Sequence, residues 1–317
     1  MSIDAWLFFN STPERNRRIL YSLLKAFGTP DRILGLTVNE LTRIQGVTPH
    51  FAGLLLKQPE VFDIQAEKDS IARNKAILLP ITHPDYPKNL RTISDPPILL
   101  YLKGALISED EFGIAVVGSR LNSFYGKTAC RTIVEKLAKS GITITSGMAR
   151  GIDTLAHTYA LGFGGRTIAV LGNGLDICYP DENAELMEQI AQKGAVLSEY
   201  PMNTPPQAKN FPERNAVIAG LSLGVVVIEA AEKSGSLITA RAGLEENRAV
   251  YAVPGDIFEP SAQGTNALIR EGAQLVRSGE DILEDLSLML QGMIQTSSSD
   301  SIRARATNPV SDKEKTP

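Results

Sequence analysis

The chain has 317 residues, 43% of them hydrophobic and 21% charged, as is typical of a globular protein with room for one large and one small domain. Its formal net charge of −4 argues against a surface coated with positive charge for duplex DNA, but allows a local positive groove. No apolar run is long enough for a membrane span and no signal peptide is recognisable. Cys130 and Cys178 lack pairing or metal-ligand spacing, so we expect a cytoplasmic protein without a membrane partner.

Residues 1–75 have the spacing of short helices. Apolar residues recur at helical intervals between Ile19 and Phe27, and Gly28 is placed to end that helix. A capping-box pattern at Thr37–Glu40 predicts a helix that continues through Ile44. We therefore predict an all-helical domain over residues 1–75.

The segment Ile44–Thr48 is a hydrophobic–Gly–hydrophobic turn between two short helices. Such a turn resembles those of SAM and helix-hairpin-helix domains, and in the latter the backbone amides of the turn can contact a DNA phosphate. A plain helical bundle is the alternative, favoured by His50, which stands where many DNA-binding hairpins carry Gly or Lys.

The second predicted domain covers residues 76–290 and begins with a proline-rich connecting segment, residues 76–110. His83–Pro87 should form a rigid surface connection leading to a strand at Ile98–Lys103, with His83 in a structural role. From Gly113 onward strands and helices alternate, which predicts an α/β fold with a doubly wound, mostly parallel sheet. The predicted strands are Ile114–Val117, Ile142–Thr145, Thr167–Leu171, Ala195–Ser198, Gly224–Ile228, Ala249–Ala252 and Gln274–Val276.

Small and basic residues follow the first two of these strands. Gly118-Ser119-Arg120 ends the first strand, and Ser146-Gly147 with Arg150-Gly151 ends the second. Loops after parallel strands share one edge of the sheet, where open α/β sheets bind ligands. Backbone N–H groups and guanidinium groups at that edge suit an anion such as phosphate.

Nucleotide and catalytic motifs are absent or weak. The Rossmann glycine fingerprint and the Walker sequence are missing, and Gly126-Lys127-Thr128 is best interpreted as an ordinary helix start. Gly172-Asn173-Gly174 alone is a weak signal for close approach of a ligand. Asp153 and His157 lie one helical turn apart, so we expect a buried hydrogen-bonded pair rather than a catalytic one. No metal site or cofactor is predicted.

Two later segments favour single-stranded nucleic acid. Phe211–Asn215 offers an aromatic ring, a guanidinium and an amide, as required for base stacking with charge. The alternatives are a core anchor for Phe211 and a structural ion pair for Arg214. Ser234–Arg241 and Gly264–Asn266 add small polar loops, so together the loops predict an extended polar groove.

Nine segments of the chain occur in the order found in one protein family. They are VVGSR, SGMARGID, TIAVLGNGLDICYP, LSEYP, FPERN with IAGLS, SGSLITARAGLE, VPGDI and GTNALIREGA. Over residues 10–286 the chain resembles the DNA-processing protein A (DprA or Smf) family. The resemblance implies a helical domain, a Rossmann-like domain that binds single-stranded DNA, and no catalytic activity. It also implies a homodimer that loads RecA onto incoming strands during natural transformation.

The resemblance also implies the DNA contacts. Arg120, with Gly118 and Ser119 beside it, would contact a phosphate, while Phe211 would stack on a base. The further contacts would be Ser146, Gly147, Arg150, Gly151, Lys209, Arg214, Asn215, Ser234, Gly235, Ser236, Arg241 and Asn266.

Three positions depart from the family pattern. Ala216 replaces a second arginine, and Asp181 replaces a basic residue of some relatives. Lys209 is the candidate for a lysine that relatives place shortly before the phenylalanine. Each lost phosphate contact should weaken binding by ~1 kcal/mol.

Our first hypothesis is therefore a non-enzymatic single-stranded DNA binder and recombination mediator. A phosphoribohydrolase-like, nucleotide-processing enzyme is the alternative, because Glu245 follows SGSLITARAGL in a place comparable to a catalytic glutamate of related folds. A regulatory scaffold is the third possibility. Residues 291–317, rich in Ser and charge, are expected to form a disordered tail without the winged helix that ends many family members.

Overall fold

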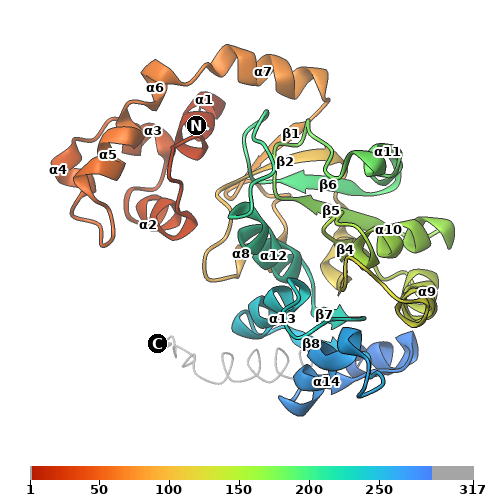
Figure 1. Ribbon diagram of the computed structural model, residues 1–317. Coiled ribbons are helices and arrows are strands. Elements are labelled where there is room, and N and C mark those ends of the chain that lie inside the picture. Colours follow the sequence, from red (N-terminus) through yellow and green to blue (C-terminus); the bar gives the residue numbers. More distant parts are fainter. Residues whose placement is uncertain (1, 288–317) are drawn as a thin grey trace, which may run out of the picture.

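The computed structural model describes residues 2–287, so the expectations for residues 291–317 lie outside the described part. Short helices form the N-terminal region, and a nine-stranded sheet flanked by helices forms the rest (Figure 1). The predicted α/β fold with a mostly parallel sheet is confirmed.

The elements have the following bounds. The helices are α1 Ile3–Asn10, α2 Arg17–Phe27, α3 Pro30–Leu34, α4 Val38–Leu41, α5 Pro49–Leu56, α6 Gln58–Val61, α7 Ile64–Arg73, α8 Lys88–Arg91, α9 Phe124–Lys139, α10 Ile152–Gly162, α11 Ala184–Lys193, α12 Asn210–Leu221, α13 Ser236–Glu245 and α14 Gln263–Arg270, with 3₁₀ turns η1 Ser108–Phe112, η2 Asp181–Asn183 and η3 Pro260–Ala262. The strands are β1 Ile77–Pro80, β2 Leu99–Gly104, β3 Ile114–Val117, β4 Ile144–Ser146, β5 Thr167–Leu171, β6 Ala195–Ser198, β7 Gly224–Val227, β8 Ala249–Ala252 and β9 Gln274–Leu275.

The N-terminal helices begin and end at the residues that their caps dictate. The predicted capping box is present, because Thr37 Oγ1 accepts from the Glu40 N–H and Glu40 Oε2 accepts from the Thr37 N–H. That helix ends at Leu41 rather than at Ile44. Gly28 ends α2 with a φ of +88°, which favours glycine. The contact between a DNA phosphate and the backbone amides of the Ile44–Thr48 turn stays a prediction.

The strand order is β1-β2-β6-β5-β4-β3-β7-β8-β9. β1 pairs antiparallel with β2 and β2 with β6, whereas the remaining pairs are parallel. Strands β4 to β6 extend from one side of β3 and β7 to β9 from the other. The order therefore reverses between β3 and β7, and ligands bind at such switch points in open α/β sheets.

Three sequence expectations about this region were wrong. β1 was not predicted, because Pro80 reads as a loop residue; an edge strand tolerates the missing N–H. β4 starts at Ile144, because the Ile142 N–H donates to the Leu137 carbonyl and closes the end of α9. The His83–Pro87 connection is not only a surface segment, because Tyr86 is buried and its hydroxyl donates to the Pro97 carbonyl (2.7 Å).

Helices cover both faces of the sheet. α9 and α10 pack on one face with α11 beside them, and α12 and α13 pack on the other (Figure 1). The apolar residues of the N-terminal helices join the same core cluster as the strands, from Trp6 and Phe9 to Val217. The helical region therefore packs directly on the α/β part of the chain.

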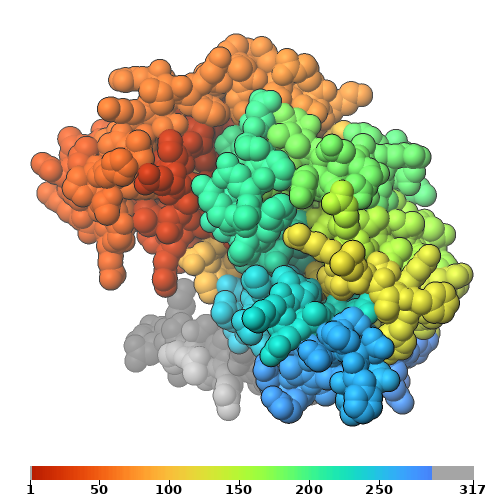
Figure 2. Space-filling view, viewed as in Figure 1, coloured from red at the N-terminus to blue at the C-terminus, as the bar shows by residue number. Residues whose placement is uncertain are grey.

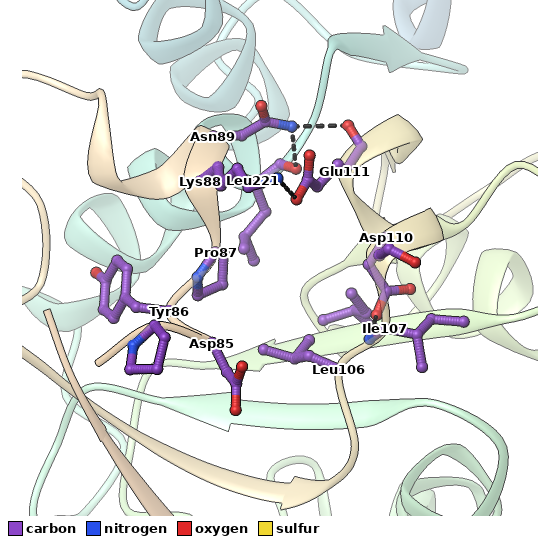
Figure 3. A pocket seen from close by; sticks show the side chains of 13 residues that line it. Asp85, Tyr86, Pro87, Lys88, Asn89, Leu106, Ile107, Asp110, Glu111 and Leu221 are labelled. Carbon is purple, nitrogen blue, oxygen red and sulfur yellow. Dashed lines mark hydrogen bonds and ion pairs between the residues drawn. The ribbon is translucent and has the colours of Figure 1, made fainter. Parts of the chain in front are cut away.

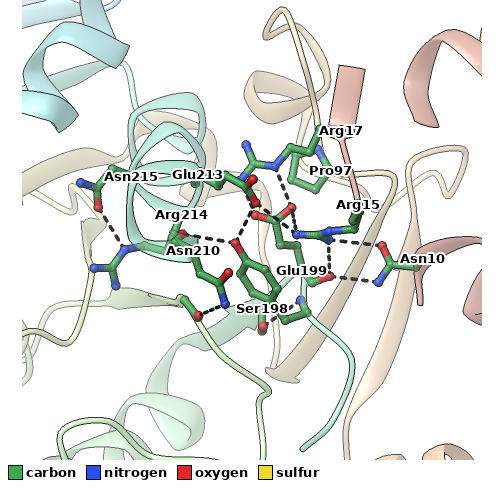
Figure 4. Close-up of polar contacts among 12 residues, drawn as sticks. Asn10, Arg15, Arg17, Pro97, Ser198, Glu199, Asn210, Glu213, Arg214 and Asn215 are labelled. Atoms are coloured by element: carbon green, nitrogen blue, oxygen red, sulfur yellow. Dashed lines mark hydrogen bonds and ion pairs between the residues drawn. The ribbon is translucent and has the colours of Figure 1, made fainter. Parts of the chain in front are cut away.

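A cluster of polar side chains, centred on the buried Glu199, connects the helical region to α12 (Figure 4). It contains Arg15, Arg17, Glu199, Tyr200 and the partly exposed Glu213. Glu199 follows β6 and receives both guanidinium groups; the Arg15 Nη2–Glu199 Oε2 distance is 3.0 Å. Burial alone would raise the pKa of Glu199, but Arg15 and Arg17 hold it below its ordinary value. The Tyr200 hydroxyl donates to Glu213 Oε2 (2.9 Å). This cluster therefore fixes the start of α12 against the helical region.

Candidate nucleic-acid interface

A groove of about 780 Å³ opens at the carboxyl ends of the central strands, where the strand order reverses. Its walls are the loop after β3, the loop after β4, Tyr179, the start of α12 and the loop between β7 and α13. Figure 2 shows this face, with the yellow residues after β3 near the teal and cyan residues of α12 and α13. Of the predicted contacts, Gly118, Ser119, Arg120, Phe211, Arg214, Asn215, Ser234, Gly235 and Ser236 line the groove.

Arg120 is the exposed cation at the mouth of the groove. Its loop is fixed by the Ser119 N–H, which donates to the Glu229 carbonyl (2.7 Å), and by Ser119 Oγ, which accepts from the Leu121 N–H (3.1 Å). Within residues 2–287 the Arg120 guanidinium has no hydrogen-bond or ion-pair partner. A rigid loop thus presents a guanidinium without an ion-pair partner in the described part, which suits a phosphate.

Several backbone N–H groups near the strand ends are occupied by the protein's own carboxylates. The Ser123 N–H at the start of α9 donates to Glu229 Oε2 (2.9 Å). The N–H groups of Gly147 and Ala149 face the buried carboxylate of Asp153. The expectation of N–H groups free for phosphate is therefore wrong for Ser119, whose N–H donates to the Glu229 carbonyl, and for Gly147, and at these positions the anion-binding charge belongs to side chains instead.

Phe211 and Tyr179 form an aromatic pair on the wall of the groove. Their ring centroids lie 6.0 Å apart with a 37° interplanar angle. Phe211 is half-buried against Gly172, where a Cβ atom would lie 3.0 Å from the ring, and Tyr179 is 43% exposed. Gly172, a weak signal in the sequence, therefore makes room for the ring. Both residues line the groove while Phe211 also packs on Gly172, so both the anchor and the stacking interpretations of Phe211 fit.

Arg214 lies beneath this pair and is only 5% exposed. Its Nη1 donates to the carbonyls of Gly147 and Val170, and Nε donates to Asn215 Oδ1 (3.1 Å). Its Cζ atom lies 5.5 Å from the Phe211 ring centroid. Burial lowers the pKa of Arg214. We infer that it chiefly holds together the ends of β4 and β5 under Phe211.

Three predicted residues of the β4 loop act within the protein. Ser146 is fully buried and its hydroxyl donates to the Val116 carbonyl (2.7 Å). Gly151 has a φ of +79° and packs so closely on Ser119 and Arg120 that a side chain would not fit. Arg150 is exposed beside the groove but forms a two-bond ion pair with Glu182, both distances 2.7 Å. Gly147 lies with Arg150 in a small side pocket of the groove.

The loop before α13 supplies small polar groups and a cation that the sequence analysis missed. Ser234 Oγ and Ser236 Oγ are 2.8 Å apart, and Lys233 beside them is exposed and lines the groove. The position of Lys233 directly before Ser234-Gly235-Ser236 could have identified this cation from the sequence. Lys209 and Arg241 are exposed but outside the groove lining. Asn266 bonds instead to the N–H and carbonyl of Gly255, at 3.2 and 3.1 Å.

The predicted hydrogen-bonded pair of Asp153 and His157 was wrong, although both side chains are buried. Thr167 Oγ1 donates to the Ile144 carbonyl, so it accepts from His157 Nδ1–H (2.7 Å), and Nε2 has no partner in the described part. Burial lowers the pKa of His157 to about 3, with Arg214 adding to the effect. Burial raises the pKa of Asp153 to about 6, against the favourable charge of Arg214.

These shifts predict opposite effects of pH on stability. As pH falls from 6.5 toward 3, the unfolded chain gains a proton at His157 and the folded chain does not, so stability is lost. The free energy of unfolding of the native chain, relative to His157→Gln, should therefore fall by about 1 kcal/mol between pH 6 and pH 5 in urea titrations. Asp153→Asn is the matched control: as pH falls from 6 to 4, the native chain should gain stability relative to that variant. A pH-independent difference for His157→Gln would contradict this account.

A smaller pocket of about 270 Å³ lies between α8 and η1 (Figure 3). Its polar groups are paired with each other: Lys88 Nζ lies 2.8 Å from Glu111 Oε1, and Asn89 Nδ2 donates to the Glu111 carbonyl (2.7 Å). Asp110 is held by Arg166 (2.7 Å). This pocket therefore offers no free charge comparable with Arg120.

Residues 2–287 contain no cluster of His, Cys, Asp and Glu that could hold a metal ion. No helix in that range is long and apolar enough to cross a bilayer. Glu245, the glutamate of the enzyme alternative, is exposed at the far end of α13 from the groove.

Comparison with known proteins identifies relatives along most of the chain. A family model described as DNA recombination-mediator protein A matches residues 77–287. The chain is 41% identical over 278 residues to protein Smf of Escherichia coli, covering 86% of this chain and 74% of that protein. It is 43% identical over 210 residues to the DNA processing protein DprA of Bacillus subtilis, covering 66% and 70%.

Two solved structures are similar to most of the fold. The X-ray structure of DNA processing protein A from Streptococcus pneumoniae superimposes with a TM-score of 0.76 at 36% identity, covering 89% of this chain and 97% of that one. A DNA processing protein A from Helicobacter pylori, described for its single-stranded DNA binding mode, gives 0.60 at 31% identity and covers 67% and 95%.

Proposed function

The chain belongs to the DNA recombination-mediator protein A family, and on that premise we propose that it binds single-stranded DNA in the groove and acts as a recombination mediator. The observation that carries the proposal is the Arg120 guanidinium, without a partner in the described part, in one groove with the exposed Tyr179–Phe211 pair. The described binding mode of the Helicobacter pylori relative supports it.

The proposed binding uses two kinds of contact. Arg120 and Lys233 attract the phosphates, because neither has an ion-pair partner among residues 2–287. The Tyr179–Phe211 pair stacks on a base, and aromatic stacking requires bases that are not paired in a duplex. Ser234, Gly235 and Asn215 border the strand as polar contacts. A contact of this kind holds a strand without reading its sequence.

Removing the Phe211 ring should weaken binding of a dT oligonucleotide. We expect Phe211→Ala to lower affinity about fivefold, equivalent to ~1 kcal/mol, because Tyr179 still offers a stacking face. Fluorescence anisotropy at fixed salt measures the effect. Phe163→Ala, at the end of α10 and away from the groove lining, is the matched control and should bind as the native chain does. If the native chain, Phe211→Ala and Phe163→Ala bind the oligonucleotide with equal affinity, base stacking on Phe211 does not contribute to binding.

We propose that this function involves no catalysis. Glu245 lies six residues, or about 9 Å along α13, beyond Thr239, the last residue of that helix in the groove lining. The phosphoribohydrolase-like alternative predicts release of free base from nucleoside monophosphates. Incubation with these compounds, followed by chromatography, should yield no base, and base released in a Glu245-dependent manner would favour the enzyme.

The remaining parts of the proposal are the partners and the compartment. We propose that the chain hands its DNA strand to RecA during natural transformation and acts as a homodimer, as the resemblance described under Sequence analysis implies; the family description itself names only a recombination mediator. The unpaired thiols of Cys130 and Cys178 favour the reducing cytoplasm. Co-sedimentation of RecA with the DNA-bound chain tests the RecA partner. The molecular mass of the chain in solution tests the homodimer.

A further inference from the structure

A second cavity, of about 640 Å³, opens on the same edge of the sheet between the start of α9 and the loops that follow β7 and β8. We call it the acidic pocket, because Glu229, Asp256 and Glu259 line it and its lining contains no Lys, Arg or His. None of the three carboxylates belongs to an ion pair within residues 2–287. Its charge is therefore opposite to that of the DNA groove.

Glu229 gives the acidic pocket a buried negative charge. The residue is 3% exposed, and its Oε2 accepts from the Ser123 N–H (2.9 Å) while Oε1 has no described partner. The N-terminal end of the 16-residue helix α9 favours a negative charge at this position. Gly126 permits the close approach, because a side chain there would collide with the carboxylate. The Ser123 N–H thus occupies one oxygen of this buried carboxylate, and the other oxygen is left for a ligand.

The rim of the acidic pocket is apolar and exposed. Phe124 is 86% exposed on one side, and Phe258, between Ile257 and Glu259 in the chain, is 85% exposed. Large exposed side chains gathered at a pocket mark interaction sites. The rim is also ordered, because the Tyr125 hydroxyl donates to the Pro254 carbonyl (2.7 Å) and Asn266 holds Gly255.

We propose that the acidic pocket binds an arginine or lysine side chain of a partner protein, with apolar neighbours of that residue packed on Phe124 and Phe258. Charge complementarity selects the cation, and the aromatic rim adds cation–π attraction. DNA is disfavoured as the occupant, because its phosphates would face three carboxylates without a counter-charge. The partner site therefore lies beside the DNA groove and can be occupied at the same time.

Two synthetic peptides test the proposal on the full chain: acetyl-Phe-Arg-Leu-Arg-amide and its matched acetyl-Phe-Glu-Leu-Glu-amide. The arginine peptide should shift the NMR amide signals of the 253–259 loop, and the glutamate peptide should not. Asp256→Asn with Glu259→Gln, both exposed positions, should weaken arginine-peptide binding at least fivefold and leave dT-oligonucleotide affinity unchanged. Glu60→Gln with Glu109→Gln, exposed elsewhere, is the control for net charge.

Three results would overturn the acidic pocket's assignment. The first is equal binding of the two peptides, and the second is unchanged arginine-peptide binding by the Asp256/Glu259 double variant. The third is a shift of the NMR amide signals of the 253–259 loop on addition of the oligonucleotide but not of the arginine peptide. Failure of DNA binding in the groove would leave these peptide results unaffected, so the two proposals are distinguishable.

Discussion

Arg120→Ala is expected to weaken binding of single-stranded DNA at least tenfold while leaving the fold intact. The guanidinium is exposed at the mouth of the groove and has no partner in the described part, so its removal breaks no internal contact. The N–H groups of Ser119 and Ser123 serve Glu229, and Arg120 is the one cationic side chain of this loop, so no neighbouring side chain of the loop replaces the lost charge. Tenfold corresponds to about 1.4 kcal/mol.

Arg120→Glu should weaken binding about tenfold further, because it adds repulsion of the phosphates. Anisotropy titrations of a dT oligonucleotide measure both variants, and circular dichroism checks the fold. Arg18→Ala provides the matched loss of one exposed arginine on the helical region. If Arg120→Ala and Arg18→Ala bind alike, the phosphate contact assigned to Arg120 is wrong.

Glu199→Ala is expected to lower the free energy of unfolding by about 3–5 kcal/mol, because it leaves the buried guanidinium groups of Arg15 and Arg17 without their carboxylate. Arg17 Nε donates to Glu199 Oε2 at 2.7 Å, and the same arginine donates to the Glu213 carbonyl at the start of α12. Loss of this cluster therefore also loosens the helix that carries Phe211 and Arg214.

Urea titration at neutral pH measures the loss. Glu188→Ala is the control, because Glu188 forms an exposed ion pair with Lys103 and surface pairs contribute about 0–1 kcal/mol. A Glu199→Ala chain that unfolds at the same urea concentration as Glu188→Ala would show that the buried cluster does not connect the two regions energetically.

The sequence predicts the sheet and its functional edge well, because the parallel strands can be recognised as short apolar runs that end in small residues. Ile114–Val117 and Thr167–Leu171 were predicted with their observed bounds. Arg120 was assigned to the groove from the loop after β3, and Phe211 from the segment Phe211–Asn215, and both line it. Local spacing was sufficient for Arg120 because it follows β3 directly, whereas Phe211 lies at the start of α12 and was recognised from the residue types of its own segment.

The failures concern partners that are distant in the chain. Nothing near Ser123 shows that the carboxylate of Glu229, more than 100 residues later, accepts its N–H. His157 and Asp153 share a helix, yet they face Thr167 and the β4 loop because those groups satisfy them better in the fold. Lys233 and Tyr179 enter the groove only when the strand order brings their loops to one edge.

The salt dependence of binding tests the central claim most directly. We predict that the logarithm of the binding constant for a dT oligonucleotide falls with the logarithm of salt concentration with a slope of about −1.4 or steeper, because Arg120 and Lys233 each release about 0.7 counterion from a single strand. Duplex of the same length should bind weakly at every salt concentration. Binding of duplex as tight as that of the single strand, or single-strand binding that does not change with salt, would contradict the account.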